Sequence, residues 1–417
     1  MNKSDKVLSL QIAGLQGFYW MIFCPIASFA SVYLLSKDFS NQKIGWVMAI
    51  SSVLAIVMQP ALGALIDRFE KLTLKSVLIT CSLLCVAFLA GIVFLNTGLV
   101  WMAVFYVGIV ALLYTMQPLV SALTFEYINA GRNINFGVTR ASGSICFAVL
   151  STLLGIWVNR YSTAILPIIC LILFAGYILL IISFPKVKRS DIQTYHTDKS
   201  TTSIEEKDKV GFLRRYDRFI PFLIGAGFIF MFHTVINNFL AQILRPLGGT
   251  DTDLGISLTI AAVAELPAFL AFSFLVAKIS TRSLMKISGF IYALRAVIFL
   301  FAASVWMINI GQVFQGLTFA VFLPASVYYI NEIMREKDRV KGQTFITGMG
   351  TLGGFFGNVI GGRLLDTSGV FAMLLFGLIG AVIGAVLLFY AIRKPRAKEP
   401  VFADNSVVDP PLKGINK

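Results

Sequence analysis

Charged residues are scarce in this sequence: Asp, Glu, Lys and Arg together make up 13% of its 417 residues. Soluble globular domains carry about a quarter. Hydrophobic residues make up 57%, and the mean hydropathy is +0.81. The shortage of charge excludes an ordinary soluble domain. It predicts an integral membrane protein, whose helices need about 20 apolar residues each to cross the hydrocarbon core.

Metal-binding, nucleotide-binding and catalytic motifs are also missing. Only two histidines occur, and the five cysteines all lie inside apolar stretches without the spacing of a metal site. The chain has no glycine loop of the Walker type, no His-x-x-x-His pair and no Gly-x-Ser-x-Gly turn. We therefore expect no enzyme activity, no metal and no cofactor, and the missing Walker loop argues against a pump driven by ATP.

Long apolar runs, separated by charged residues or by Gly and Asn, predict twelve membrane-spanning helices and hence an all-α membrane protein. An even number of spans places both ends of the chain on the same side of the membrane. The predicted spans lie at 9–35, 43–66, 74–96, 99–127, 138–159, 163–184, 219–245, 254–277, 284–305, 308–333, 343–364 and 369–392.

The basic residues gather in the loops on one side of these spans. If both termini are cytoplasmic, 28 of the 35 Lys and Arg residues are cytoplasmic and five are external. Lys and Arg are enriched in the cytoplasmic loops of membrane proteins. The net charge of +14 could suggest a nucleic-acid-binding protein. Its distribution instead excludes nucleic acid as the partner and predicts a multi-pass protein with both termini in the cytoplasm.

One long polar stretch divides the twelve spans into six and six. Its composition is typical of a mobile linker, and the region after the last span, rich in proline and charge, is typical of a disordered tail. The predicted parts are an N-terminal six-helix bundle, a cytoplasmic linker, a C-terminal six-helix bundle and a disordered cytoplasmic tail, at 1–185, 186–218, 219–393 and 394–417.

The two halves show weak internal similarity. An offset of 210 residues places Gly45 on Gly255 in the second and eighth spans, and Gly143 on Gly353 in the fifth and eleventh. Two related six-helix halves around a site at the middle of the bilayer are typical of secondary transporters. The same organisation predicts alternating access, in which the two bundles rock about the site.

The segment GALIDRFEKLTLK, Gly63 to Lys75, resembles the signature loop between the second and third helices of the major facilitator superfamily. In that family a glycine lets the helices approach closely, and the acid and bases form a conformational latch on the cytoplasmic side. The resemblance implies the major facilitator fold and a monomeric state. It gives the latch roles to Gly63, Asp67 and Arg68, with Lys71 as a further partner of the acid.

The chain is more narrowly similar to the lactose permease and oligosaccharide:proton symporter branch of that superfamily. The segment NFGVTRASGSICF resembles the fifth-helix motif of the branch and contains Arg140. Glu265 and Arg295 match the acid of the eighth helix and the arginine of the ninth. The resemblance implies proton-coupled uptake of a sugar, oligosaccharide or similar small polar solute across a bacterial cytoplasmic membrane.

The chain departs from this branch at several positions. Ser121 stands where the branch has a sugar-binding acid in the fourth helix, and Phe147 replaces the stacking Trp of the fifth. Gln315 and Thr318 replace the His and Glu that translocate the proton in the tenth helix. These differences predict a solute other than a galactoside and a proton pathway built from different residues.

Three ionisable residues, His233, Glu265 and Arg295, lie near the centres of their predicted spans. A charge at the middle of the bilayer costs about 2.5–3.5 kcal/mol on insertion scales, so such residues face a protein interior or a wet cavity. Burial favours the neutral form of a carboxyl group, and a nearby cation favours the ionised form. We interpret Glu265 as the proton-coupling residue. A structural ion pair between Glu265 and Arg295 is the alternative.

Neighbouring polar residues are candidates for the solute site. His233 has Asn237 one helical turn away, and it could relay a proton, bind solute or serve as a satisfied interior residue. The guanidinium of Arg140 suits vicinal hydroxyls or a carboxylate, with Glu126 as its partner in the site or in a plain ion pair. Phe147 could stack on a sugar ring or simply pack. Gln315 offers a neutral amide.

The sequence therefore predicts a proton-coupled secondary transporter whose partners are a small solute, protons and the lipid bilayer. Two other functions compete with uptake. Proton-driven efflux of drugs or small amphiphiles would suit an interior rich in Phe and poor in charge. The other alternative is a membrane sensor or scaffold with a transporter fold, whose function would tolerate the loss of the Glu265 carboxylate.

Overall fold

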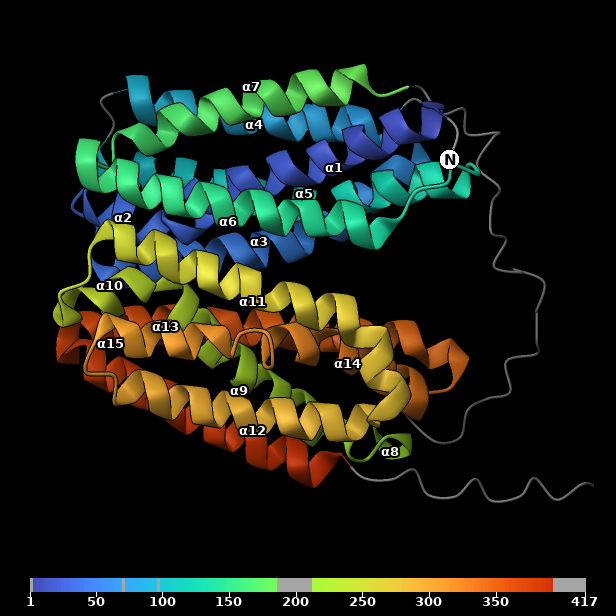
Figure 1. Ribbon diagram of the computed structural model, residues 1–417, viewed down its shortest axis with the longest axis vertical. Coiled ribbons are helices and arrows are strands. Elements are labelled where there is room, and N and C mark those ends of the chain that lie inside the picture. Colours follow the sequence, from blue (N-terminus) through green and yellow to red (C-terminus); the bar gives the residue numbers. More distant parts are fainter. Residues whose placement is uncertain (1–2, 70–71, 96–97, 186–211, 393–417) are drawn as a thin grey trace, which may run out of the picture.

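The computed structural model describes residues 3–69, 72–95, 98–185 and 212–392, and these residues form helices and connecting turns without a β-strand. The helices lie side by side in two groups, one from each half of the sequence (Figure 1). The predicted all-α membrane fold is confirmed. The predicted tail at 394–417 and most of the predicted linker lie outside the described residues.

The N-terminal group contains six spans. The first is interrupted by a π-helical segment that begins at Cys24 and contains Pro25, which has no backbone N–H to continue the regular ladder. The elements are α1 (Lys3–Phe23), η1 (Cys24–Ser28), α2 (Ala30–Leu35), α3 (Asn41–Arg68), α4 (Leu74–Phe94), α5 (Leu99–Asn129), α6 (Phe136–Tyr161) and α7 (Ile165–Ser183).

The C-terminal group supplies the other six spans. Ten helices of the described chain are long and apolar enough to cross a membrane. The longest holds two spans that meet at Gly369, and α13 with α14 forms one more, which gives the predicted twelve. The elements are α8 (Phe212–Arg215), α9 (Phe219–Asn238), α10 (Leu240–Leu244), η3 (Arg245–Leu247), α11 (Asp251–Lys278), α12 (Thr281–Leu300), α13 (Val305–Val313), α14 (Phe319–Ile333) and α15 (Glu336–Ala391).

The two groups pack closely at one end, where α3 meets α15 and α6 meets α11. The backbone of Gly45 lies against the carbonyl of Asn358, and that of Gly255 against the carbonyl of Ser151, so that a Cβ at either glycine would overlap its neighbour. The hydroxyl of Thr259 adds hydrogen bonds across α6 and α11. We call this region the closed end; it comprises 41–51, 148–155, 251–259 and 358–366.

The paired glycines of the two halves make equivalent contacts. Gly45 and Gly255 each pack their helix against a helix of the opposite half. Gly143 packs α6 against α1 near Trp20, and Gly353 packs α15 against α9 near Gly227. The offset of 210 residues therefore relates helix–helix contacts in the two halves as well as residue types in the sequence.

The other end of the molecule is loosely packed. No residue of α3 after Ala55 is buried, and of the α11 residues after Ala262 only Phe272 is buried. We call 56–68 and 263–278 the open end. The described beginning of α1 lies at the same end of the molecule as α8, and α6 and α11 diverge toward it (Figure 1).

The described part of the predicted linker packs on the C-terminal group. Tyr216 donates a hydrogen bond of 2.9 Å from its hydroxyl to Asp338, and Arg215 forms an ion pair of 3.7 Å with the same carboxylate. The aromatic ring of Phe212, in α8, lies 5.8 Å from that of Phe345. Residues 212–218 are thus attached to the start of α15.

Candidate functional site

The tenth span is broken at the centre of the candidate site. The sequence predicts one continuous helix at 308–333, but α13 ends at Val313 and α14 begins only at Phe319. At the break, the backbone of Gly316 lies against the carbonyl of Ala264 in α11, with no room for a Cβ. Ser288 of α12 donates a hydrogen bond of 2.9 Å to the carbonyl of Thr318. Tertiary contacts therefore hold the break and bring it beside Glu265.

A hydrogen-bonded network runs through this break. Arg295 is fully buried and donates from its two terminal nitrogens to the side-chain oxygens of Gln315 and Gln312. Gln315 in turn donates from Nε2 to Oε1 of Glu265 at 3.0 Å. A more distant bond of 3.4 Å joins Arg295 to Thr318. The amide of Gln315 thus connects the buried cation to the carboxylate.

Glu265 and Arg295 are not joined in a direct ion pair by the described residues, since the amide of Gln315 stands between them. They interact electrostatically, and Glu265 also interacts electrostatically with Arg140 of the opposite half. The side chain of Glu265 is partly exposed, whereas Arg295 is inaccessible. The carboxylate is therefore the accessible end of the network, placed between one cation in each half.

Arg140 rests on an aromatic ring that sequence reasoning missed. Its guanidinium carbon lies 4.3 Å from the centroid of the Trp20 ring, within the range of a cation–π interaction. Its Nη1 donates to the hydroxyl of Ser144 at 3.3 Å. Gly143, one turn along α6, leaves space for Trp20, because a Cβ there would overlap the indole. A Trp in the middle of the first span was the available signal.

Phe147 belongs to an aromatic wall on the same side. Its ring makes an edge contact with Trp20, with the ring centroids 6.4 Å apart. Trp20 also contacts Phe23 at 5.1 Å, and Phe23 contacts Tyr114 at 6.0 Å. The predicted stacking role of Phe147 stays a prediction, but Trp20 is the ring that directly adjoins Arg140.

His233 lies close to the network without a hydrogen bond to it in the described structure. Its ring stacks on Phe319 at 4.5 Å with an interplanar angle of 9°, and it interacts electrostatically with Arg295. Asn237 donates from Nδ2 to the carbonyl of His233 at 2.8 Å and lies within 3.3 Å of its ring nitrogens. Asn237 thus contacts His233 from one turn away on the same helix, and the role of both residues in transport stays a prediction.

Glu126 lies in the last turn of α5, and Arg140 lies in the first turns of the next helix, α6. The neighbouring Phe125 stacks on Phe136 at 4.7 Å, which joins this turn to the start of α6. The contacts of Arg140 described above are with Trp20 and Ser144. A pairing of Arg140 with Glu126 therefore stays a prediction.

The predicted latch lies at the open end. A Cβ at Gly63 would meet nothing within 4 Å, so the close helix approach implied by the resemblance is not formed in this conformation. Asp67 is exposed, and Arg68 lies over the ring of Phe69 with 5.7 Å to the centroid. Lys71 lies outside the described residues. A latch made by Gly63, Asp67 and Arg68 stays a prediction.

The closed end has a carboxylate held by hydrogen bonds across the two halves, which sequence reasoning missed. The carboxylate of Asp366 accepts hydrogen bonds from the backbone N–H of Asn41 and of Gln42, at 3.1 and 2.8 Å, and from the Asn41 side chain at 2.8 Å. Burial alone would raise the pKa of Asp366, but these hydrogen bonds outweigh it and lower the pKa. An anion at the N-terminus of α3 also suits the helix dipole.

Known transporters resemble this chain along nearly its whole length. A maltose permease of Geobacillus stearothermophilus is 24% identical over 389 residues, which cover 91% of this chain and 94% of the relative. The uncharacterized transporter YwbF of Bacillus subtilis strain 168 is 25% identical over 396 residues, which cover 93% and 94%. The crystal structure of the nucleoside transporter NupG has the same fold, with a TM-score of 0.76, 18% identity and coverage of 94% and 98%.

The family assignment rests on a match that spans both halves of the chain. The family model described as the MFS_1 like family matches residues 12–376. The predicted resemblance to the major facilitator superfamily is confirmed, and these relatives are membrane transporters rather than enzymes. The chain belongs to the MFS_1 like family, and it is a multi-pass membrane transporter of the major facilitator superfamily.

Proposed function

We propose that this transporter takes up a sugar or a similar small hydroxylated solute together with protons. The observation that carries the proposal is the network from Arg295 through Gln315 to Glu265, which lies opposite Arg140 of the other half. The names of a maltose permease and a nucleoside transporter among the similar proteins support a solute with a sugar ring.

The side chains of the site suit hydroxyl groups. Arg140 presents a planar set of donors, and the carboxylate of Glu265 accepts hydrogen bonds, so a vicinal diol could bridge the two. The ring of Trp20 offers an apolar surface beside them. Ligand sites commonly combine such apolar walls with a few polar groups that fix orientation.

Proton coupling follows from the position of Glu265. A carboxylate taken out of water favours the protonated form, whereas Arg140 and Arg295 favour the ionised form. Solute that draws Arg140 away from Glu265 would favour proton uptake, and solute release would restore the ionised pair. Binding of proton and solute would then be linked, and the linkage is reciprocal.

Alternating access supplies the mechanism of movement. The distribution of basic residues supports a cytoplasmic location for both termini, so the open end would face the cytoplasm and the closed end the outer side. The present conformation would then be inward-facing. Transport requires the contacts of α3 with α15 and of α6 with α11 to separate while the open end closes. A bacterial cytoplasmic membrane and a monomeric state complete the proposal.

Proton-driven efflux of an amphiphile is the second candidate function. The observation that favours it is the aromatic wall of Trp20, Phe23, Tyr114 and Phe147 beside an acidic group. Such a wall would also bind a greasy cation. The two functions differ in the direction in which a proton gradient drives the solute.

Uptake into right-side-out proteoliposomes with an inward proton gradient distinguishes the candidates. Maltose, other disaccharides, nucleosides and cationic dyes serve as radiolabelled or fluorescent probes. We expect accumulation of a sugar or nucleoside that collapses when a protonophore is added, and that falls at least tenfold in Arg140→Gln. Arg160→Gln, an exposed arginine at the end of the same helix, is the matched control. Proton-driven exclusion of a dye, with no accumulation of hydroxylated solutes, would overturn the uptake proposal.

A further inference from the structure

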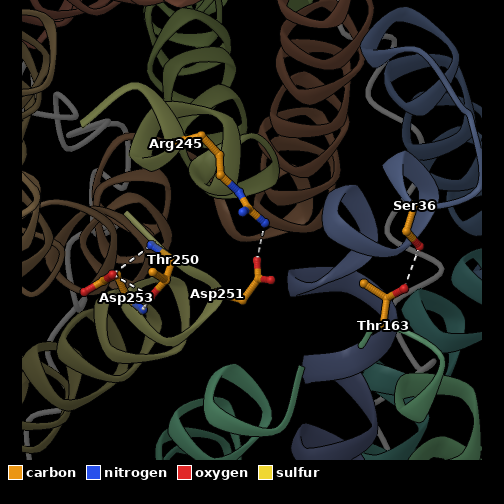
Figure 2. A network of polar contacts seen from close by, with 6 residues as sticks. All are labelled: Ser36, Thr163, Arg245, Thr250, Asp251 and Asp253. Carbon is orange, nitrogen blue, oxygen red and sulfur yellow. Dashed lines mark hydrogen bonds and ion pairs between the residues drawn. The ribbon is translucent and has the colours of Figure 1, made fainter. Parts of the chain in front are cut away.

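A separate cavity of about 290 Å³ lies at the closed end, away from the central network. Both halves of the chain line it, the N-terminal half through the end of the first span and the turn before α7, and the C-terminal half through the end of the seventh span and the start of α11. Figure 2 shows Ser36 and Thr163 on one side, and Arg245 and Asp251 on the other. The remaining lining residues are Val32, Leu35, Ala241 and Gln242.

The oxygen of a buried amide in the cavity wall lacks a hydrogen-bond donor among the described residues. Gln242 is only 8% exposed, and its Nε2 donates to the side-chain oxygen of Asn41 at 3.0 Å. Its Oε1 has no hydrogen-bond donor in the described structure. A buried acceptor without a donor costs about 1–3 kcal/mol. Because this oxygen is itself inaccessible, a bound O–H or N–H would satisfy it only after the side chain turns toward the cavity.

The hydroxyl groups of the wall are also left as acceptors. The hydroxyl of Ser36 donates to the carbonyl of Tyr33 at 2.7 Å, which uses its single proton. The 2.6 Å contact between Ser36 and Thr163 must then be donated by Thr163. Each hydroxyl carries one proton and two lone pairs, so Thr163 has acceptor capacity left and no proton to offer.

The charges of the wall cancel. Arg245 donates to one oxygen of Asp251 at 2.6 Å, so the cavity holds one cation and one anion. A charged ligand would thus meet no excess of the opposite sign. Val32 and Leu35 give the N-terminal wall an apolar surface beside its two hydroxyls, while the charged groups come from the C-terminal half.

We propose that this cavity binds a small neutral polyol or monosaccharide from the outer compartment. The neutral wall, with acceptors on Thr163 and Asp251 and further donors on Arg245, matches a ligand rich in hydroxyl groups and without net charge. The volume lies just below the range of about 300–1,000 Å³ that drug-sized ligands occupy, which suits a smaller ligand of this kind. The carbon side of the ligand would lie against Val32 and Leu35.

Occupancy of the cavity would regulate the transporter, an inference that rests on the proposed alternating access and orientation. Both halves build the wall, so the site exists only while the closed end is closed. A ligand that binds one conformation stabilises it by a factor of 1 + [L]/Kd. External polyol at ten times its dissociation constant would therefore lower the outward-open population about elevenfold and slow uptake.

Saturation-transfer NMR with sorbitol tests binding without any need for transport. We expect magnetisation transfer from the purified full-length protein to sorbitol, but not to its fully O-methylated form, which has no donors. Ala241→Leu should fill the cavity and Thr163→Val should remove an acceptor, and each should reduce the transfer at least fivefold. Thr367→Val, at an exposed hydroxyl bonded to its own helix, is the matched control and should leave it unchanged. Equal transfer in all variants, or none in the wild type, would show that only water occupies the cavity.

Cysteine labelling tests the conformational effect. Ala49→Cys, at a position fully buried on α3 at the closed end, is introduced after the five native cysteines are replaced. A membrane-impermeant maleimide is added from the outside of intact cells. Sorbitol should slow labelling about tenfold, and the effect should vanish in the Ala241→Leu background. Sorbitol binding by NMR with unchanged labelling would overturn the regulatory part. If sorbitol slowed labelling equally in the wild-type and Ala241→Leu backgrounds, the regulatory part would also be overturned, because the effect would then be that of a general osmolyte.

Discussion

The two halves of the chain contribute unequal parts to the central site. The C-terminal half supplies a fixed network in which Arg295, Gln315 and Glu265 are joined by hydrogen bonds and held by a broken helix. The N-terminal half supplies Arg140, which rests on Trp20 and makes one hydrogen bond of 3.3 Å. Several hydrogen bonds hold the first arrangement, whereas one hydrogen bond and a ring contact hold the second. We infer that the C-terminal half carries the coupling charge and the N-terminal half responds to it.

Loss of the buried cation should break the C-terminal network most severely. Arg295→Met leaves two buried amide oxygens without their donor, and each unsatisfied acceptor costs about 1–3 kcal/mol. We expect transport to fall at least 100-fold and thermal stability in detergent to fall clearly. Arg363→Met, at an exposed arginine, is the matched control. Normal transport by Arg295→Met would mean that the network is only a packing device.

The break in the tenth span should be nearly as sensitive. Gly316→Val places a side chain into the carbonyl of Ala264, and overpacking of this kind costs about 1–3 kcal/mol. We expect Gln315 to move away from Glu265 and uptake to fall about tenfold. Gly348→Val, at a glycine with open space around its Cβ position, tests whether any added side chain does the same. Equal losses in both variants would count against a special role for the break.

Removal of the ring beneath Arg140 should affect the N-terminal half more mildly. A cation–π contact contributes about 0.5–2 kcal/mol, so Trp20→Leu should raise the KM for the solute about fivefold with little change in maximal rate. The exposed Trp101 gives the matched control, Trp101→Leu. A loss as large as that of Arg295→Met would show that the N-terminal half is not the adaptable partner.

The contact that joins the halves at the closed end should give the smallest effect. Asp366→Asn removes a charge at the N-terminus of α3, worth about 0.3–1 kcal/mol, and should speed labelling of Ala49→Cys about two- to fivefold. Asp38→Asn, an exposed acid near the same end, should not.

The same contact sets a pH dependence. Because the pKa of Asp366 is lowered in this conformation, its contribution to closure is complete at neutral pH and above the ordinary carboxyl pKa. It is lost only as the pH falls through the lowered pKa. We expect the contribution of Asp366, measured as the ratio of labelling rates in Asp366→Asn and wild type, to stay constant from about pH 8 to 5. A ratio that changes near pH 6 or 7 would contradict this assignment.

Much of the architecture could be predicted from the sequence, because long apolar runs and costly embedded charges leave few alternatives. The twelve spans, Glu265 and Arg295 all follow from that argument. The break at Gly316 could not be predicted, since glycine is tolerated within membrane helices and the break depends on the approach of Ala264.

Two other features depended on long-range contacts. Trp20 is one of five Trp residues and lies in the middle of the first predicted span, but only the packing at Gly143 brings it to Arg140. Asp366 meets Asn41 across 325 positions of the sequence, and no local pattern marks that pair. Both contacts join helices that are distant in the chain, so they are properties of the packed molecule.

Glu265 is the residue on which the coupling mechanism depends, and solute-induced pH change tests it most directly. The outer medium of lightly buffered vesicles is monitored while a transported solute is added without a pH gradient. We predict external alkalinisation with the wild type. The control variant Glu332→Gln should behave in the same way, because Glu332 lies near the end of α14 and pairs with Arg282 of α12. Glu265→Gln should give none, although it still equilibrates solute down its gradient. Undiminished alkalinisation by Glu265→Gln would contradict the proposed mechanism.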